Sequence, residues 1–124
     1  GVGSTDLAVS LATGRNWFKV PETIKIILNG KLPKGVFAKD IILYIIGDLT
    51  ANGATYQAIE FYGPAVKNLD MSGRFTICNM VGELGAKCGF MPVYSKTIHY
   101  LRQRTNKIYK VFSSDDNAKY AVIK

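Results

Sequence analysis

Stretches with a strand-like pattern alternate along this chain with stretches that have a helix-like pattern. In PETIKIILNG, residues 21–30, isoleucine and leucine alternate with other residues and Asn29-Gly30 supplies a turn, so we predict a strand. KDIILYIIGDL, residues 39–49, fits a helical stripe although isoleucine also favours extended chain, and we interpret it as a buried helix. AIEFYG, residues 58–63, predicts another strand. This alternation predicts an α/β layered domain with a parallel or mixed sheet covered by helices.

Local signals predict one further element at each end of the chain. Residues 4–13 read as a helix, with Ser4 or Thr5 as N-cap and Gly14 as the residue that ends it. Residues 121–124, AVIK, predict a final extended segment.

The remaining elements lie in the second half of the chain. We predict a helix capped by Ser72 and ended by Gly89, then a short strand or loop at residues 90–93. Residues 95–105 predict a helix, and IYKVF, residues 108–112, predicts a strand.

The charge of the chain favours an anionic partner. Sixteen Lys and Arg against nine Asp and Glu give a net charge of +7. YLRQRTNKIYK, residues 100–110, is the nearest approach to a nucleic-acid-binding stripe. We interpret it instead as a solvated helix face followed by an edge strand. A small polycarboxylate substrate or an acidic companion subunit would fit the charge equally well.

The length of 124 residues predicts one domain, and no run of eighteen apolar residues is present to span a bilayer. The first residues lack both an initiator Met and a basic, apolar leader, so we expect a piece of a longer polypeptide. We expect this piece to be soluble and cytoplasmic.

Cys78 and Cys88 are ten positions apart. On a helix this separation is about 15 Å, beyond the roughly 7 Å that a disulfide allows between Cα atoms. We therefore expect free thiols in a reducing compartment. His99, the one histidine, does not complete a zinc set with them at any usual spacing. The sequence predicts no metal-binding or cofactor-binding residue in this chain.

TICNMVGELGAKCG places an amide, Asn79, and a carboxylate, Glu83, four residues apart among apolar residues. On a helix these two side chains share one face. Small residues lie beside them: Gly82, Gly85 and Ala86. An anion with apolar neighbours must be paired, hydrogen-bonded or protonated, and each outcome suits acid–base chemistry. The alternative is that Glu83 faces water from a half-exposed helix.

Several long segments of this sequence resemble the aconitase superfamily, and within it the large subunits of 3-isopropylmalate dehydratases. They include FTICNMVGELGAKCGFMPV and, before it, KVPETIKIILNGKLPKGVFAKDIILYIIGDLTANGATYQAIEFYGPAV. GVGSTDLAVSLATG resembles the segment after that family's active-site Ser-His loop, and YKVFSSDDNAKYA resembles the approach to its next domain. The resemblance covers essentially the whole chain.

The resemblance implies a hydro-lyase that isomerises 2-isopropylmalate and 3-isopropylmalate by dehydration and rehydration, in leucine biosynthesis. A [4Fe–4S] cluster with one iron free of cysteine acts in such enzymes as a Lewis acid. The C-N-M-x-x-E helix of the family assigns Asn79 a place near the cluster. It assigns Glu83 a pairing with an active-site histidine. Cluster ligands and catalytic histidines are expected outside this chain.

The resemblance also predicts the organisation and the partners of the protein. Residues 1–17 would be the tail of a preceding domain and residues 18–124 an aconitase-like α/β domain, inactive by itself. The expected partners are the remaining domains of the large subunit, the small subunit and a small hydroxy-dicarboxylic acid substrate, without a membrane or nucleic acid. Alternatives are a homoaconitase, citramalate-isomerising or aconitase relative and, in another class, an RNA-binding or purely structural domain.

Overall fold

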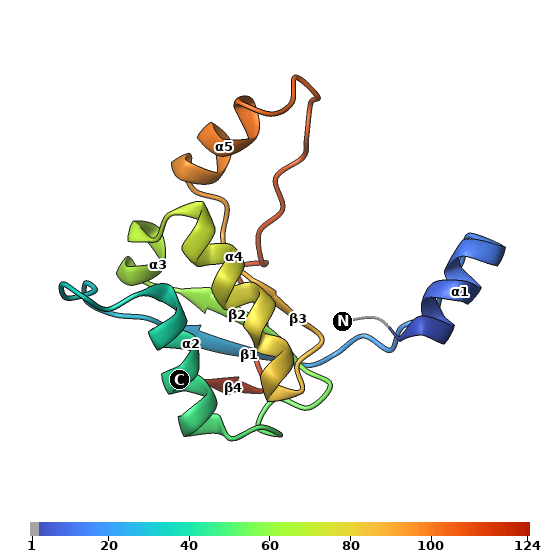
Figure 1. The fold of residues 1–124 in the computed structure, drawn as a ribbon, viewed down its shortest axis with the longest axis horizontal. Helices are drawn as coiled ribbons and strands as arrows, with labels where there is room; N and C mark the ends of the chain where they lie inside the picture. The colour runs from blue at the N-terminus through green and yellow to red at the C-terminus, as the bar shows by residue number, and fades with distance from the viewer. Residues whose placement is uncertain (1–2) are drawn as a thin grey trace.

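The structure is a computed structural model that describes residues 3–124, so Gly1 and Val2 of the predicted tail lie outside it. Figure 1 shows the arrangement of the elements. In chain order they are α1 (Ser4–Thr13), β1 (Thr23–Ile27), α2 (Ala38–Leu49), β2 (Ala58–Tyr62), α3 (Pro64–Asn68), α4 (Met71–Met80), the 3-10 helix η1 (Val81–Leu84), β3 (Cys88–Phe90), α5 (Ser95–Arg102) and β4 (Val122–Ile123).

The strands form one sheet in the order β3-β2-β1-β4, and every neighbouring pair is parallel. Helices α2 and α4 contact each other over one face of this sheet (Figure 1). The predicted α/β layered fold is therefore confirmed, with a parallel rather than a mixed sheet. The helices predicted at residues 4–13, 39–49 and from Ser95 onward are confirmed as α1, α2 and α5, and the final extended segment contains β4.

The alternating side chains of β1 and β2 show which face of the sheet packs against the core. The register pairs Ile24 with Ile59 and Ile26 with Phe61, and all four side chains are buried. They belong to the same hydrophobic cluster as Ile42 of α2. Because successive strand residues point to opposite faces, this set packs under the helices while its neighbours face the other side.

The opposite face of the sheet is polar and partly covered by the end of the chain. The Lys25 Nζ lies 4.6 Å from the ring centroid of Tyr62 and 4.8 Å from that of Tyr120. Both tyrosine hydroxyls donate to Glu60 Oε2, at 3.0 and 2.9 Å. Burial raises the pKa of Tyr62 to about 12, so this phenol stays protonated at neutral pH. The polar face is thus a connected network.

Helix α4 begins and ends at different residues from those predicted. Asp70 is the N-cap, and its Oδ1 accepts from Gly73 N at 2.7 Å, so the prediction of Ser72 as cap is wrong. The helix stops at Met80, η1 follows, and Gly85 ends η1 with φ 75°. The predicted end at Gly89 is therefore also wrong, because the left-handed residue comes four positions earlier and lets the chain reverse into β3.

One other prediction fails outside the core. Residues 108–112 form no strand, and among the described residues no neighbouring strand pairs with them. Ile108 and Phe112 are exposed there, so their apolar pattern has no sheet to support it. Pro64 opens helix α3 directly after β2, a position where its missing N–H costs nothing.

Helix α1 extends away from the sheet (Figure 1). Its N-cap is Gly3 rather than Ser4 or Thr5, whereas Gly14 ends it in the left-handed conformation, as predicted. No residue of α1 is buried. The helix therefore contributes nothing to the core described above.

The longest helix, α2, has 12 residues. Within the described part of the chain, no helix combines the length and the apolar character needed to cross a membrane.

Candidate active site

Asn79 lies in the last turn of α4 and Glu83 lies in η1, which continues directly from it. Both residues are exposed, whereas Ile77, Val81 and Leu84 of the same segment are buried in the core. Within residues 3–124 neither polar side chain forms a hydrogen bond. The segment is therefore amphipathic, and its polar side is open to a partner.

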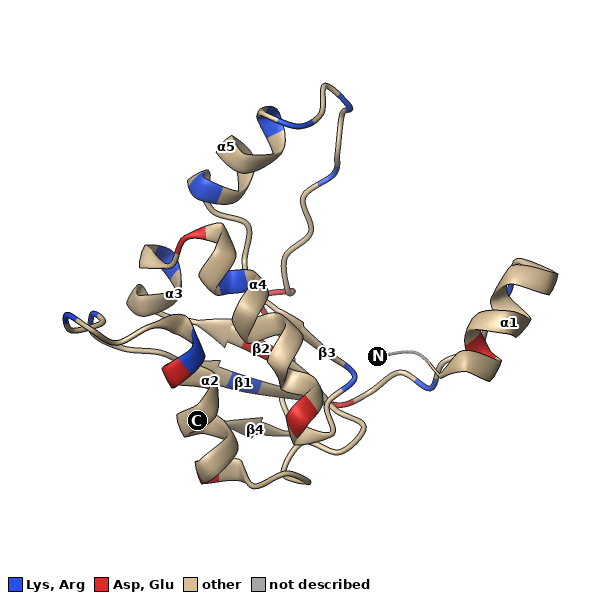
Figure 2. Cartoon of the chain, in the orientation of Figure 1, with Lys and Arg blue, Asp and Glu red and all other residues tan. Residues whose placement is uncertain are grey.

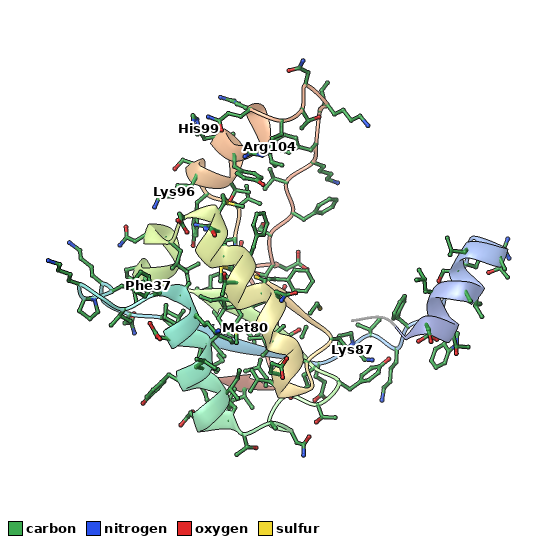
Figure 3. The ribbon with its side chains drawn as sticks, viewed as in Figure 1. Phe37, Met80, Lys87, Lys96, His99 and Arg104 are labelled. Carbon is green, nitrogen blue, oxygen red and sulfur yellow. The ribbon has the colours of Figure 1, made fainter. Side chains whose placement is uncertain are left out.

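The geometry of this segment differs from the continuous α-helix that the sequence predicted. In a 3-10 helix, residues three apart eclipse one another. Asn79 lies in α4 and Glu83 in η1, so the regular spacing of one continuous α-helix does not extend across the pair. Met80 marks the point where α4 ends (Figure 3). Both side chains are exposed on this segment.

The small residues predicted beside the two polar groups have different positions in the fold. Gly82 is exposed, and a Cβ there would meet open space. Gly85 packs on Thr55, because a Cβ there would lie 3.0 Å from the Thr55 Oγ1. Ala86 is buried in the core and does not flank the site. Only Gly82 leaves the approach to Glu83 free of side-chain bulk.

The turn that carries Glu83 is held by the loop between α2 and β2, residues 50–57. Three backbone hydrogen bonds join the loop to the turn. They run from Ala54 N to Leu84 O (3.1 Å), from Tyr56 N to Gly85 O (3.0 Å) and from Lys87 N to Gln57 O (2.9 Å). Sequence reasoning missed this role, because the Asn52-Gly53 pair indicates only a break in the chain.

Cys78 and Cys88 are not separated along one helix as predicted, because the chain reverses at Gly85 and β3 contacts α4. A Cβ on Gly89 would lie 3.2 Å from the Cys78 Cα, so position 89 faces α4. Strand side chains alternate, so Cys88 points to the opposite face, and both cysteines are free. Burial raises the pKa of each thiol, which disfavours the thiolate form that binds metals.

His99 lies on α5, well away from Met80 at the end of α4 (Figure 3). It is exposed, and its Nε2 lies 2.9 Å from the Gln103 Nε2. Among residues 3–124, no three His, Cys, Asp or Glu side chains gather closely enough to hold a metal ion. Of the residues predicted for the site, Asn79 and Glu83 are the ones that the described part of the chain leaves exposed on one segment.

An exposed amide and an exposed carboxylate on a firmly held turn can take part in only a few kinds of chemistry. The amide can donate and accept hydrogen bonds, and the carboxylate can accept a proton or orient a cationic group. A proton-transfer site needs a second group within hydrogen-bond reach, and the described residues supply none to Glu83. The geometry is that of one wall of a site.

A family model, that of the aconitase family (aconitate hydratase), matches residues 1–123. The chain belongs to the aconitase family. The resemblance seen in the sequence is confirmed over almost its full length, and the Asn79–Glu83 segment lies inside the matched aconitase region.

Individual relatives in the aconitase family agree with this assignment. The 3-isopropylmalate dehydratase large subunit of Thermodesulfovibrio yellowstonii is 53% identical over 124 residues, 100% of this chain and 30% of that protein. The subunit of the same name in Heliobacterium modesticaldum is 54% identical over 121 residues, 98% of this chain and 29% of that protein. The probable methanogen homoaconitase large subunit of Methanothermobacter thermautotrophicus is 47% identical over 120 residues, 97% of this chain and 28% of that protein. The chain thus spans less than a third of the length of these relatives.

Proposed function

We propose that this chain is part of the large subunit of a hydro-lyase that interconverts 2-isopropylmalate and 3-isopropylmalate, by removing water and adding it back, in leucine biosynthesis. The observation that carries the proposal is the 53% identity across all 124 residues with a large subunit of that name. A homoaconitase activity is the second candidate, supported by the 47% identical relative of that name. The small hydroxy-dicarboxylic acid would bind between this domain and the rest of the protein.

In this proposal Glu83 shares a proton with a histidine supplied from outside the described chain. Three features support the role: the side chain is exposed, it lacks a partner within residues 3–124, and its turn is held by the loop of residues 50–57. Asn79, exposed one turn earlier, would hydrogen-bond near the cluster. Both roles come from the family motif, and the structure supplies the open, firmly held surface that they need.

An iron–sulfur cluster is part of the proposed enzyme, and when bound it supplies Lewis acidity toward the substrate hydroxyl. The residues of this chain do not fit as its ligands. Cys78 and Cys88 point to different sides of β3, and burial raises the pKa of both thiols. We therefore assign the cluster ligands to other parts of the protein. The two free thiols suit the cytoplasmic location that we propose for the enzyme.

Exposed apolar side chains on α1 and the following linker support a partner on that side. Leu11, Trp17 and Val20 are 79%, 82% and 87% exposed. Large apolar side chains exposed to this degree favour a contact with protein. We assign residues 1–17 to the preceding domain of the large subunit, which would cover these side chains. The small subunit is a second expected partner, because the relatives carry the name of large subunits.

Trp17 gives a direct test of this assignment, because it is the single tryptophan of the chain. We expect acrylamide to quench its fluorescence strongly in the 124-residue chain and several-fold less in a complete large subunit whose other tryptophans are replaced by Phe. The reason is that the adjoining domain would remove the indole from water. Equal quenching in the two proteins would show that nothing covers Trp17.

The alternative of an RNA-binding module receives less support from the structure. Lys and Arg gather on α5 and the loop after it (Figure 2), as a phosphate-binding surface requires. Single-stranded RNA binding also needs free aromatic faces. The Arg104 guanidinium lies 3.6 Å from the Tyr100 ring centroid, and Phe75 packs against the same ring at 5.7 Å. Tyr100 is thus already engaged, whereas Tyr109 and Phe112 of the loop after α5 are exposed.

The proposed activity is tested by assembling the complete large subunit with its small subunit and a reconstituted cluster. We expect this enzyme to convert 2-isopropylmalate into the 3-isomer, measured by chromatography of the products, and the 124-residue chain alone to show no turnover. The chain lacks a partner for Glu83, so it cannot complete the proton transfer. A higher kcat/KM on the homoaconitase substrate would favour the second candidate, and no turnover of either acid would refute both.

A further inference from the structure

Two residues other than glycine have positive φ within residues 3–124, and both lie in the loop of residues 50–57. They are Thr50, with φ 67°, and Tyr56, with φ 58°. A β-branched or bulky side chain is strained in this region of backbone space. Glycine would adopt it freely. Where such a residue contributes to the fold or to function, the contacts of its backbone and side chain must offset this strain.

Tyr56 makes such contacts in three directions. Its backbone N donates to Gly85 O at 3.0 Å, two residues after Glu83. Its ring lies 4.4 Å from the Nζ of Lys87, which is on the strand side of the same turn (Figure 3). Its hydroxyl accepts a hydrogen bond from the backbone N of Lys19 at 3.3 Å. One strained residue thus joins the Glu83 turn to the linker that leads from α1.

The loop also packs directly on the turn beside Tyr56. A Cβ on Gly85 would lie 3.2 Å from the Thr55 Cα. The Thr55 hydroxyl donates to Asn52 O at 2.9 Å, which closes the loop on itself. Ala54 is fully buried, and its N donates to Leu84 O at 3.1 Å. The turn cannot move without moving this loop.

We propose that Tyr56 is a positioning residue for Glu83. Through Gly85 and Lys87 it sets the place of the Glu83 turn, and through Lys19 it ties that turn to the segment from which α1 extends. This inference rests on the proposed function, in which Glu83 meets a histidine from the preceding domain. Since proton transfer requires heavy atoms within about 3 Å, a small displacement of the turn lowers the rate of the chemical step more than it weakens substrate binding.

The variants that test this role separate strain from contact. Tyr56→Gly keeps the positive φ and the backbone N–H that donates to Gly85 O, but it removes the ring beside Lys87 and the hydroxyl that accepts from Lys19 N. Tyr56→Asn is a second variant, because asparagine also tolerates the left-handed region. Thr50→Gly is the matched control, since it relieves the same kind of strain in the same loop. The Thr50 backbone bonds only to Ile46 and Gly53, neither of them in the Glu83 turn.

All variants are made in the complete large subunit, assembled with the small subunit and a reconstituted cluster, and kcat and KM are measured for 2-isopropylmalate. We expect Tyr56→Gly and Tyr56→Asn to lower kcat by about tenfold or more with KM within about twofold of the parent, and Thr50→Gly to change neither. A purely structural residue would lower the melting temperature without this split between kcat and KM. Unchanged kcat in both Tyr56 variants, or an equal loss in Thr50→Gly, would overturn the proposal.

A second readout does not depend on activity. Hydrogen exchange of the Lys87 amide, which donates to Gln57 O at 2.9 Å, reports whether the turn stays docked on the loop. We expect its exchange to be about tenfold faster in Tyr56→Gly and unchanged in Thr50→Gly. If the parent enzyme does not turn over isopropylmalate, the proposed function fails, but faster exchange would still establish that Tyr56 holds the turn. Unchanged exchange would refute the positioning role whatever the substrate is.

Discussion

Glu83→Gln in the complete large subunit is expected to lower kcat by about 10²- to 10⁴-fold, the range typical of a lost general acid or base. Glutamine has the same size and can still form hydrogen bonds, but it cannot take up or release a proton. Glu83 is exposed on η1, so the substitution should leave stability within about 0.5 kcal/mol. Turnover is measured with a reconstituted cluster and the small subunit, and folding by circular dichroism.

The matched control for Glu83→Gln is Glu22→Gln, which neutralises another exposed carboxylate just before β1. Within the described residues, no side-chain hydrogen bond joins Glu22 to the Glu83 turn or to the loop of residues 50–57. We expect Glu22→Gln to keep full activity. Near-parental turnover by Glu83→Gln, with an intact cluster, would remove Glu83 from the mechanism.

The central part of the fold was predictable because local pattern and tertiary environment agree there. The isoleucines of residues 39–49 fit both a helix and a strand, and the length of the run decided correctly for the helix α2. In residues 21–30, alternation placed Ile24 and Ile26 on one face, and the sheet buries both. In these two elements the spacing of the apolar residues matches the side that the fold buries. The sequence alone was therefore sufficient to predict them.

The predictions that failed depend on contacts distant in sequence. The pattern of residues 108–112 is that of a strand, but no strand in the described chain forms backbone hydrogen bonds with these residues. The sequence indicated Gly89 as the residue that ends the helix, because glycine is typical of that position. Gly85 ends η1 because the loop of residues 50–57 accepts and donates hydrogen bonds there. Such choices are made by tertiary packing and are not visible in a local window.

The candidate site, like the fold, was predicted only in part. Asn79 and Glu83 were found from the family motif, and their exposure agrees with a role toward a partner. Their predicted placement on one continuous α-helix is wrong, because α4 ends at Met80 and Glu83 lies in η1. Tyr56 gave no sequence signal at all, since tyrosine does not indicate positive φ. Its contribution appears only when the loop and the turn are seen together.

Arg74 is the one buried charged side chain in the described chain, 4% exposed, and it connects α3, α4 and the segment before α5. Its guanidinium donates only to neutral acceptors. They are Val66 O (3.0 Å), Pro92 O (3.1 Å), Thr97 Oγ1 (3.2 Å) and Leu69 O (3.4 Å). Burial lowers the pKa of this guanidinium, but an arginine side chain stays charged in proteins. These acceptors therefore stabilise the buried cation, and the cation supplies their hydrogen-bond donors.

Arg74→Met is expected to lower the free energy of unfolding of the 124-residue chain by about 3 kcal/mol or more, because buried carbonyls lose their donors and each charge-assisted bond contributes about 1.5–3 kcal/mol. Lys39→Met, which removes an exposed cation from α2, serves as the control and should change stability by less than about 0.5 kcal/mol. Urea unfolding followed by circular dichroism measures both. Arg74→Lys should fall between them, since one ammonium cannot reach acceptors on several elements. If Arg74→Met were as stable as Lys39→Met, the joint between α3, α4 and the α5 segment would be held by apolar packing instead.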